Sequence, residues 1–381
     1  EEVSGFLRRR LGEQIRLRQA GTEARSPRAL ELVLRGEQAY EDARALGGSL
    51  DTTDIASALE MLARADALMA QAEAADPRWA RPPIGRAWVA LHGVRWSDEA
   101  GRRARVDSVR ARAGRVLARE PSNARALEVR GSALATVALQ PGADADVLLD
   151  EAERDLRAAL AAEPSLAGAW GTLSLVLYAR GRFADSDLAA RHALEHDAYL
   201  EDADELLARR TYAALMAGDL GAAAEACERG RRGFPRDWRF VECRLTLLRE
   251  DASRPPDAAL AWRLVAQLDT LDPPPRAAAG GRAYAPIYRR VAAAAVSARA
   301  GQADSARAVL ARARRDASSD RESRVALAYD EAYVLLLLGA RDDARARLRA
   351  YLDQRPALRP FMARDPLVRA LLTDSAGRTA P

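Results

Sequence analysis

Apolar residues recur every three to four positions along most of this 381-residue chain, the spacing that places them on one face of an α-helix. The pattern is interrupted by turn signals, most of them a proline, at intervals of 34 to 46 residues. A Gly-containing break usually divides each interval midway, which predicts two antiparallel helices per interval. The turn signals are Asp76-Pro77, Glu120-Pro121, Glu163-Pro164, Asp197-Ala198, Phe234-Pro235, Asp272-Pro273, Ser318-Ser319 and Arg355-Pro356.

One interval shows this spacing most clearly. Small residues at its eighth and twentieth positions let the two helices of a pair approach closely, and larger residues fill the gaps between pairs. The pattern resembles the tetratricopeptide repeat (TPR), and the resemblance covers about residues 27–356. In this interval the pattern residues are Trp170, Leu173, Ser174, Leu177, Gly181, Phe183, Ser186, Ala190, Ala193 and Ala198; the next interval repeats it at Leu207, Thr211, Ala214, Gly218, Leu220, Ala223, Cys227, Gly230 and Pro235, and the last at Gly339, Ala344, Leu348, Tyr351 and Pro356.

The resemblance implies an all-α fold: a right-handed α-solenoid of about eight stacked helical hairpins, because a single hairpin cannot bury its apolar stripe alone. We expect three segments, namely an N-terminal amphipathic helix and linker over residues 1–26, the solenoid over 27–356, and a C-terminal cap with a frayed tail over 357–381. In the first hairpin, Ser26 is expected to cap the first helix, with Pro27 in its first turn. The second helix of that hairpin should run unusually long, from about Asp54 to Ala75.

Both ends of the chain carry apolar residues that lie outside the repeats. Four of them lie four residues apart in an Arg-rich N-terminal helix, and others belong to the capping segment 361–372. Since an open solenoid has two uncapped ends, these residues could dock on a second copy and propagate head-to-tail oligomers or filaments. The residues predicted for self-association are Val3, Leu7, Leu11, Ile15, Phe361, Leu367 and Leu371.

A second resemblance concerns the two ends of the chain. The stretch from Leu7 to Leu17, the motif Ser26-Pro27-x-Ala29-x-Glu31-Leu32-Val33 and the run Arg364-Asp365-Pro366-Leu367 are similar to the C-terminal repeat region of bacterial membrane-anchored Ser/Thr kinases and related regulators. The kinase's own motifs are absent from the sequence. This likeness implies a sensor or scaffold module without catalytic activity, and it favours an extracytoplasmic or cell-surface location.

Composition narrows the classes of function. All 59 basic residues are arginine, interspersed with 55 acidic residues to a net charge of +4, which argues against a nucleic-acid-binding stripe. The missing lysine argues against a groove that clamps a C-terminal carboxylate. No apolar run is long enough to cross a membrane. Alanine, with 86 residues, supplies both helix propensity and the small side chains that close packing needs.

The sequence offers little chemistry. His192 and His196 lie four residues apart and could provide two ligands of a metal site, but histidine is also favoured at a solvated helix C-terminus. With His92 far away in sequence and no nucleophile motif, we predict no metal site, no cofactor and no enzymatic activity. Cys227 and Cys243 could meet between stacked hairpins, either as a disulfide or as two small apolar core residues.

The predicted concave groove is the one informative surface. The first helix of each pair lines it, with tyrosine, methionine and leucine side chains that suit an apolar helix or extended peptide of a protein partner. Equally, some of these residues could be ordinary core between hairpins. The predicted groove residues are Leu175, Tyr178, Tyr212, Leu215, Met216, Tyr329, Tyr333 and Leu336.

Overall fold

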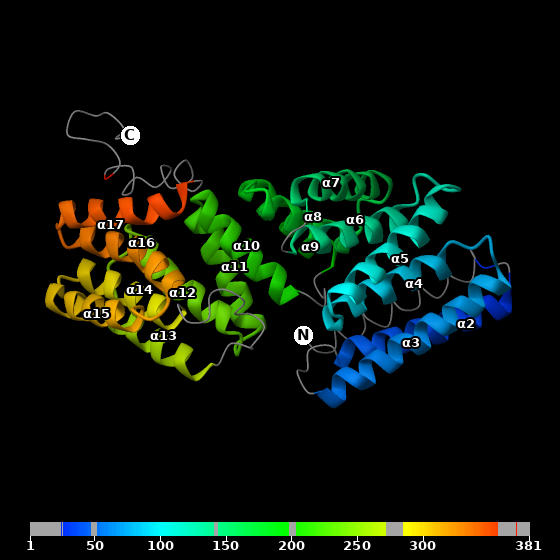
Figure 1. Cartoon of the computed structure of the whole chain (residues 1–381), viewed down its shortest axis with the longest axis horizontal. Coiled ribbons are helices and arrows are strands. Elements are labelled where there is room, and N and C mark those ends of the chain that lie inside the picture. The colour runs from blue at the N-terminus through cyan, green and yellow to red at the C-terminus, as the bar shows by residue number, and fades with distance from the viewer. Residues whose placement is uncertain are drawn as a thin grey trace. The chain divides into compact units, whose positions relative to one another are not determined.

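Helices and short turns account for the whole described chain, which confirms the predicted all-α class. The computed structural model describes residues 24, 26–46, 52–140, 144–197, 203–271, 285–356 and 371. In this part of the chain there are 16 α-helices, one short 3-10 helix and no strand (Figure 1). None of the helices described is both long and apolar enough to span a membrane.

The helices belong to two compact units, Glu1–Arg209 and Arg210–Pro381. The boundary falls inside one helix, α10 (Ala203–Ala217). Within each unit, helices adjacent in sequence pair as antiparallel hairpins, and the hairpins stack in chain order. The predicted division of the chain at residues 26 and 356 stays a prediction.

The described residues of unit 1 form four hairpins. Buried apolar side chains from α4 through α9 form one cluster that runs through three of these hairpins, and Val89 of α4 packs with the core of the first hairpin. The helices are α2 (Pro27–Leu46) with α3 (Thr52–Ala75), α4 (Arg81–His92) with α5 (Glu99–Leu117), α6 (Ala124–Ala138) with α7 (Ala145–Ala162), and α8 (Ala167–Ala179) with α9 (Phe183–His196); the 3-10 helix η1 (Gly93–Trp96) follows α4.

The described residues of unit 2 form the second half of α10, the helix that follows it, and then three further hairpins. Arg210 on α10 pairs with Glu225 on the next helix, at 3.1 Å. The remaining helices are α11 (Leu220–Gly233), α12 (Trp238–Glu250), α13 (Ala258–Thr270), α14 (Ala285–Arg299), α15 (Ala303–Asp316), α16 (Arg321–Leu337) and α17 (Arg341–Gln354).

The predicted turn signals fall where the second helices end, apart from Asp272-Pro273, which lies outside the described residues. The helix α3 ends at Ala75, one residue before Asp76-Pro77, and α11 ends at Gly233, directly before Phe234-Pro235. The long second helix of the first hairpin runs from Thr52 to Ala75, within two residues of the expected start. At the start of α2, the Ala29 amide donates to Ser26 Oγ at 3.3 Å, which confirms the predicted cap.

Glycines divide four of the hairpins midway. Gly181, Gly218, Gly301 and Gly339 have φ between 69° and 80°, a conformation that residues with a Cβ rarely adopt. Each ends a first helix, and the following residue donates its amide back into the last turn, as Arg182 does to the Leu177 carbonyl at 2.9 Å. The Gly-containing breaks in the sequence are therefore helix stops that turn the chain into the second helix.

Small residues bring the paired helices together. Ser174 and Ser186 are both fully buried, and their hydroxyls lie 3.1 Å apart between α8 and α9. A Cβ on Gly131 of α6 would lie 2.9 Å from Cγ of Leu156 on α7, closer than side chains tolerate. These contacts are the physical basis of the small residues seen at the eighth and twentieth positions.

Candidate functional site

The first helices of consecutive hairpins contact one another within each unit. In unit 1 these helices are α2, α4, α6 and α8, and in unit 2 they are α12, α14 and α16. We call the side formed by these helices the inner face of each unit. In unit 2 it includes the adjoining part of α10, whose Tyr212 donates a hydrogen bond to Glu242 of α12. Side chains from several hairpins meet there, so a site on the inner face draws on residues far apart in sequence.

The predicted groove residues of unit 1 lie on α8. Leu175 and Tyr178 are both half-buried. The Tyr178 ring contacts the edge of Phe183 with centroids 5.4 Å apart, and burial raises the pKa of its hydroxyl. The two residues form a partly covered apolar surface.

A buried carboxylate lies on the inner face of unit 1, where sequence reasoning placed none. Glu128 of α6 is 3% exposed and lies against the start of α8, where the Ala169 amide donates to it. A Cβ on Gly168 would lie 2.5 Å from Glu128 Oε1, so a larger residue there would displace the carboxylate. Burial raises the pKa of Glu128 to about 7; Arg125, 3.7 Å away, opposes this rise and Glu163 adds to it.

Glu128 should make unit 1 less stable as the pH rises. The folded unit keeps this proton up to about pH 7, whereas the unfolded chain releases it near 4.5, so stability falls across that window and stays lower above it. Glu128→Gln should therefore stabilise unit 1 at pH 8 by about 2 kcal/mol and flatten this dependence. Urea unfolding at pH 5 and pH 8 measures both effects. The exposed Asp107→Asn serves as control, and an unchanged pH dependence in Glu128→Gln would contradict the assignment.

The predicted groove residues of unit 2 differ in their exposure. Met216 is 41% exposed, whereas Tyr333 is 6% exposed and donates its hydroxyl to the Arg249 carbonyl at 3.4 Å. Tyr333 therefore belongs to the core beneath the inner face rather than to its solvent-facing surface. The half-buried residues of the predicted set are Tyr212 and Leu215 on α10, with Tyr329 and Leu336 on α16.

Arg249 of α12 contacts an acidic residue and three tyrosines on the inner face of unit 2. Its guanidinium donates to Asp330 Oδ1 at 2.6 Å, and both side chains are almost fully buried. The rings of Tyr333, Tyr288 and Tyr329 surround it, at 4.7, 5.8 and 5.9 Å from the guanidinium carbon. Burial opposes the charge, but Asp330 and Glu250 outweigh it and hold the pKa of Arg249 well above its ordinary value. The cluster thereby joins α12, α14 and α16.

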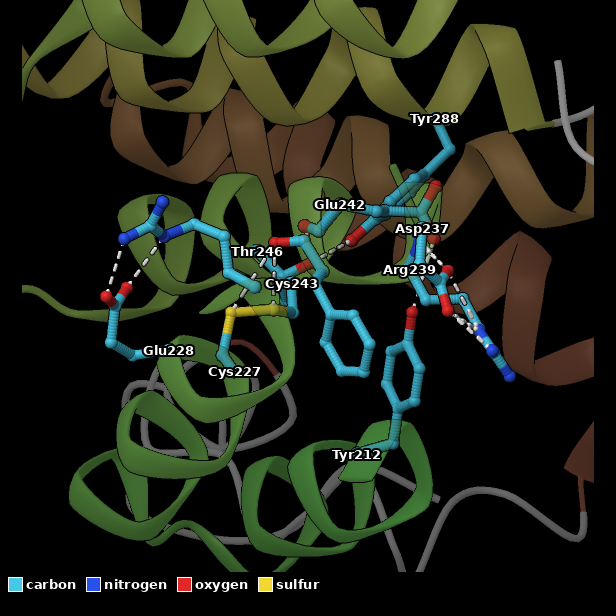
Figure 2. The surroundings of a disulfide bond; sticks show 11 residues. Tyr212, Cys227, Glu228, Asp237, Arg239, Glu242, Cys243, Thr246 and Tyr288 are labelled. Carbon is cyan, nitrogen blue, oxygen red and sulfur yellow. Dashed lines mark hydrogen bonds and ion pairs between the residues drawn. A yellow bond between two sulfur atoms is a disulfide. The ribbon is translucent and has the colours of Figure 1, made fainter. Parts of the chain in front are cut away.

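A second polar network connects α10 to the same face. Tyr212 donates its hydroxyl to Glu242 Oε2 at 3.3 Å, and Arg289 Nε donates to Glu242 Oε1 at 3.2 Å. One turn further along α12, the hydroxyls of Thr246 and Tyr288 lie 3.0 Å apart. Figure 2 shows Tyr212 reaching from α10 toward Glu242. The unit 2 inner face thus combines the tyrosines predicted for the groove with buried charged residues that the sequence did not indicate.

A disulfide fixes α12 to the preceding hairpin. Cys227 of α11 and Cys243 of α12 are bonded, with Cα atoms 6.2 Å apart, and both are almost completely buried (Figure 2). Nearby, a Cβ on Gly230 would collide with the ring of Phe240, so the two helices are in close contact. Cys243 directly follows Glu242 in the chain. The bond therefore fixes the position of the Glu242 carboxylate relative to α11.

The charged members of the inner face were missed at the sequence level, although they left a signal. Glu242, Thr246 and Arg249 are separated by four and three residues, the spacing of one helical stripe. Charged residues interspersed along a helix are also typical of a solvated face, so these three do not stand out in the sequence. The sequence signal of such a cluster is a row of ionisable residues at helical spacing on one first helix, together with tyrosines on the neighbouring first helices.

The remaining predictions concern the histidine pair and the residues predicted for self-association. The His192 ring lies 4.7 Å from that of Trp170, with Nδ1 3.4 Å from Glu195, and no group able to hold a metal occurs among the described residues. Leu371 is 3% exposed and packs into the core of unit 2, so its side chain is not available to a second copy. Val3, Leu7, Leu11, Ile15, Phe361 and Leu367 lie outside the described residues.

No protein-family model and no curated protein matches this chain. Among solved structures, a thermophilic TPR protein from Thermus thermophilus is 18% identical over 56% of this chain and 98% of its own, with a TM-score of 0.39. PilF from Pseudomonas aeruginosa is 14% identical over 64% and 95%, with a TM-score of 0.45. A TPR protein from Parabacteroides merdae is 16% identical over 80% and 98%, with a TM-score of 0.38. Likeness at this level of identity concerns the fold alone.

Proposed function

We propose that this chain is a non-catalytic protein–protein interaction scaffold whose unit 2 inner face binds a peptide or helix of a protein partner. The observation that supports this is the arrangement of Tyr212, Tyr329 and Met216. The two rings are half-buried and held by hydrogen bonds or ring contacts, while Met216 projects into solvent. Rigid aromatic side chains beside an adaptable methionine lose little entropy when they bind an apolar segment.

Replacing Tyr212 tests this proposal. Tyr212→Ala should cost about 2 kcal/mol of binding free energy, as expected for an aromatic anchor, without changing the helical circular dichroism. A photo-crosslinking residue in place of Met216 identifies the partner, and titration of the purified partner measures affinity. Leu188→Ala is the control, because Leu188 is 50% exposed on α9 of unit 1. Equal affinity of wild type and Tyr212→Ala for the partner captured at position 216 would overturn the assignment.

A second candidate function is self-assembly in a head-to-tail manner. The observation that favours it is an uneven charge: unit 1 carries 34 acidic residues against 29 arginines, and unit 2 carries 21 against 30. Opposite net charges attract unlike ends of two copies, and this attraction weakens with salt. Light scattering at low and high ionic strength tests the idea, and a monomer at both would remove it.

A further inference from the structure

A pocket of about 330 Å³ opens on unit 2 among α13, α14 and α15, and we call it the α15 pocket. Its wall is mostly apolar, and the Trp262 ring forms one side of it. That ring is fixed in place, because its Nε1 donates to Ser297 Oγ at 3.2 Å. The other apolar residues of the wall are Ile287, Ala308, Val309 and Ala313. A preformed apolar hollow of this size accepts an apolar group without first having to open.

The charged residues at the α15 pocket already have partners. Arg290 of α14 donates to Asp269 at 3.2 Å, and the Arg312 guanidinium lies 3.6 Å from the Asp316 carboxylate. Each guanidinium is thus matched by a carboxylate, and neither is left to hold a small anion by itself. We therefore expect an apolar group, rather than an ion, in the pocket.

Unit 1 exposes apolar side chains of the kind that such a pocket accepts. Among the described residues four large apolar side chains are exposed, and Leu139, Val147 and Leu188 belong to unit 1. Leu139 and Val147 lie where α6 ends and α7 begins, at the tip of one hairpin. They are 46% and 51% exposed, so burying them in an apolar pocket would remove a large part of each side chain from water.

The same hairpin tip is acidic. Between Arg130 and Arg154 the sequence has five acidic residues and no arginine. Asp144 and Asp146 lie shortly before Val147, and both are exposed. Neither forms an ion pair within the part of the chain that the structure describes. The tip of the α6–α7 hairpin thus combines an exposed apolar side chain with negative charge.

The helices around the α15 pocket carry the opposite charge. Together, α14 and α15 contain seven arginines and two aspartates. In the described structure three carboxylates from other helices pair with these arginines, namely Glu242, Asp269 and Glu331. Even when all five carboxylates are counted, two arginines remain in excess. This local excess agrees with the net positive charge of unit 2.

We infer that the tip of the α6–α7 hairpin of one copy docks into the α15 pocket of a second copy, with the Val147 side chain inside the pocket. The inference rests on the self-assembly candidate and names the contact that would carry it. Apolar burial supplies the attraction at short range, and the charges favour tip with pocket over tip with tip or pocket with pocket. Because tip and pocket lie on different units, the contact is heterologous and leaves one tip and one pocket exposed for further copies.

Sedimentation velocity of the full-length chain at low ionic strength tests this contact, and wild type should associate as its concentration rises. Val147→Asp places a carboxylate in the pocket, and Ala308→Trp fills the pocket from its exposed wall, so each should weaken association about tenfold or more. Leu188→Asp is the matched control and should associate as wild type does, since Leu188 is 50% exposed on α9 of the same unit. Circular dichroism checks the fold of each variant, and Val147→Ser takes the place of Val147→Asp if the latter loses helix.

A mixture of the two variants gives the sharper result. Val147→Asp keeps an intact pocket and Ala308→Trp keeps an intact tip, so an equimolar mixture should form a dimer and stop there. A mixture that stays monomeric, or variants that associate as strongly as wild type, would overturn this contact and leave self-assembly by another surface standing. A wild type that stays monomeric at every concentration would instead remove the self-assembly candidate together with the contact.

Discussion

Asp330→Ala should destabilise unit 2 by about 3–5 kcal/mol, because it removes the buried carboxylate that is hydrogen-bonded to Arg249 and leaves the half-buried Glu250 to offset that charge. The two side chains are 5% and 7% exposed, and the structure holds the pKa of Arg249 so far above neutrality that the guanidinium stays charged. Hydrogen exchange in the peptides of α12 and α16 measures the loss within unit 2 of the intact chain.

Two companion variants separate this effect from a general loss of contacts. Asp342→Ala removes an ion pair to Arg345 on the exposed surface of α17 and should leave stability unchanged. The double change Arg249→Met with Asp330→Leu removes both charges and should recover most of the stability lost in Asp330→Ala. Faster exchange in the double variant than in Asp330→Ala would contradict this account of the cluster.

Loss of the Cys227–Cys243 disulfide should cost about 3 kcal/mol, again within unit 2. The bond closes a loop spanning 16 positions in sequence, and opening it restores the conformational entropy of that loop to the unfolded chain. Denaturant unfolding with and without a reductant measures the effect. The double variant Cys227→Ala with Cys243→Ala should match the reduced wild type and should not respond to reductant. Two free thiols in protein purified without reductant would contradict the bond.

The hairpins could be predicted from the sequence because their signals are local. Pro77 and Pro235 mark the ends of helices through their own backbone restriction, and Gly181 or Gly339 stops a helix through its own φ. The small residues at Ser174 and Ser186 indicate close packing for the same reason. Each of these rules needs only a few neighbouring residues.

The inner face of unit 2 could not be predicted in the same way. Arg249 and Asp330 are 81 positions apart, and they meet only because three hairpins stack in one register. Tyr329 and Tyr333 lie on one helical stripe, yet one is half-buried and the other is core, since neighbouring helices cover α16 unevenly. Sequence periodicity identified this stripe, but the pairing of charges across it depends on the packed fold.

The place where the two units divide has a practical consequence for anyone who expresses them separately. A cut between Arg209 and Arg210 would sever α10 and leave each fragment with about two turns of helix, too short to persist alone in water. A fragment of unit 1 should extend to Ala217, and a fragment of unit 2 should begin at Ala203. With this shared helix retained in both, Arg209 keeps its hydrogen bond to Gly171 in one fragment, and Tyr212 keeps its bond to Glu242 in the other.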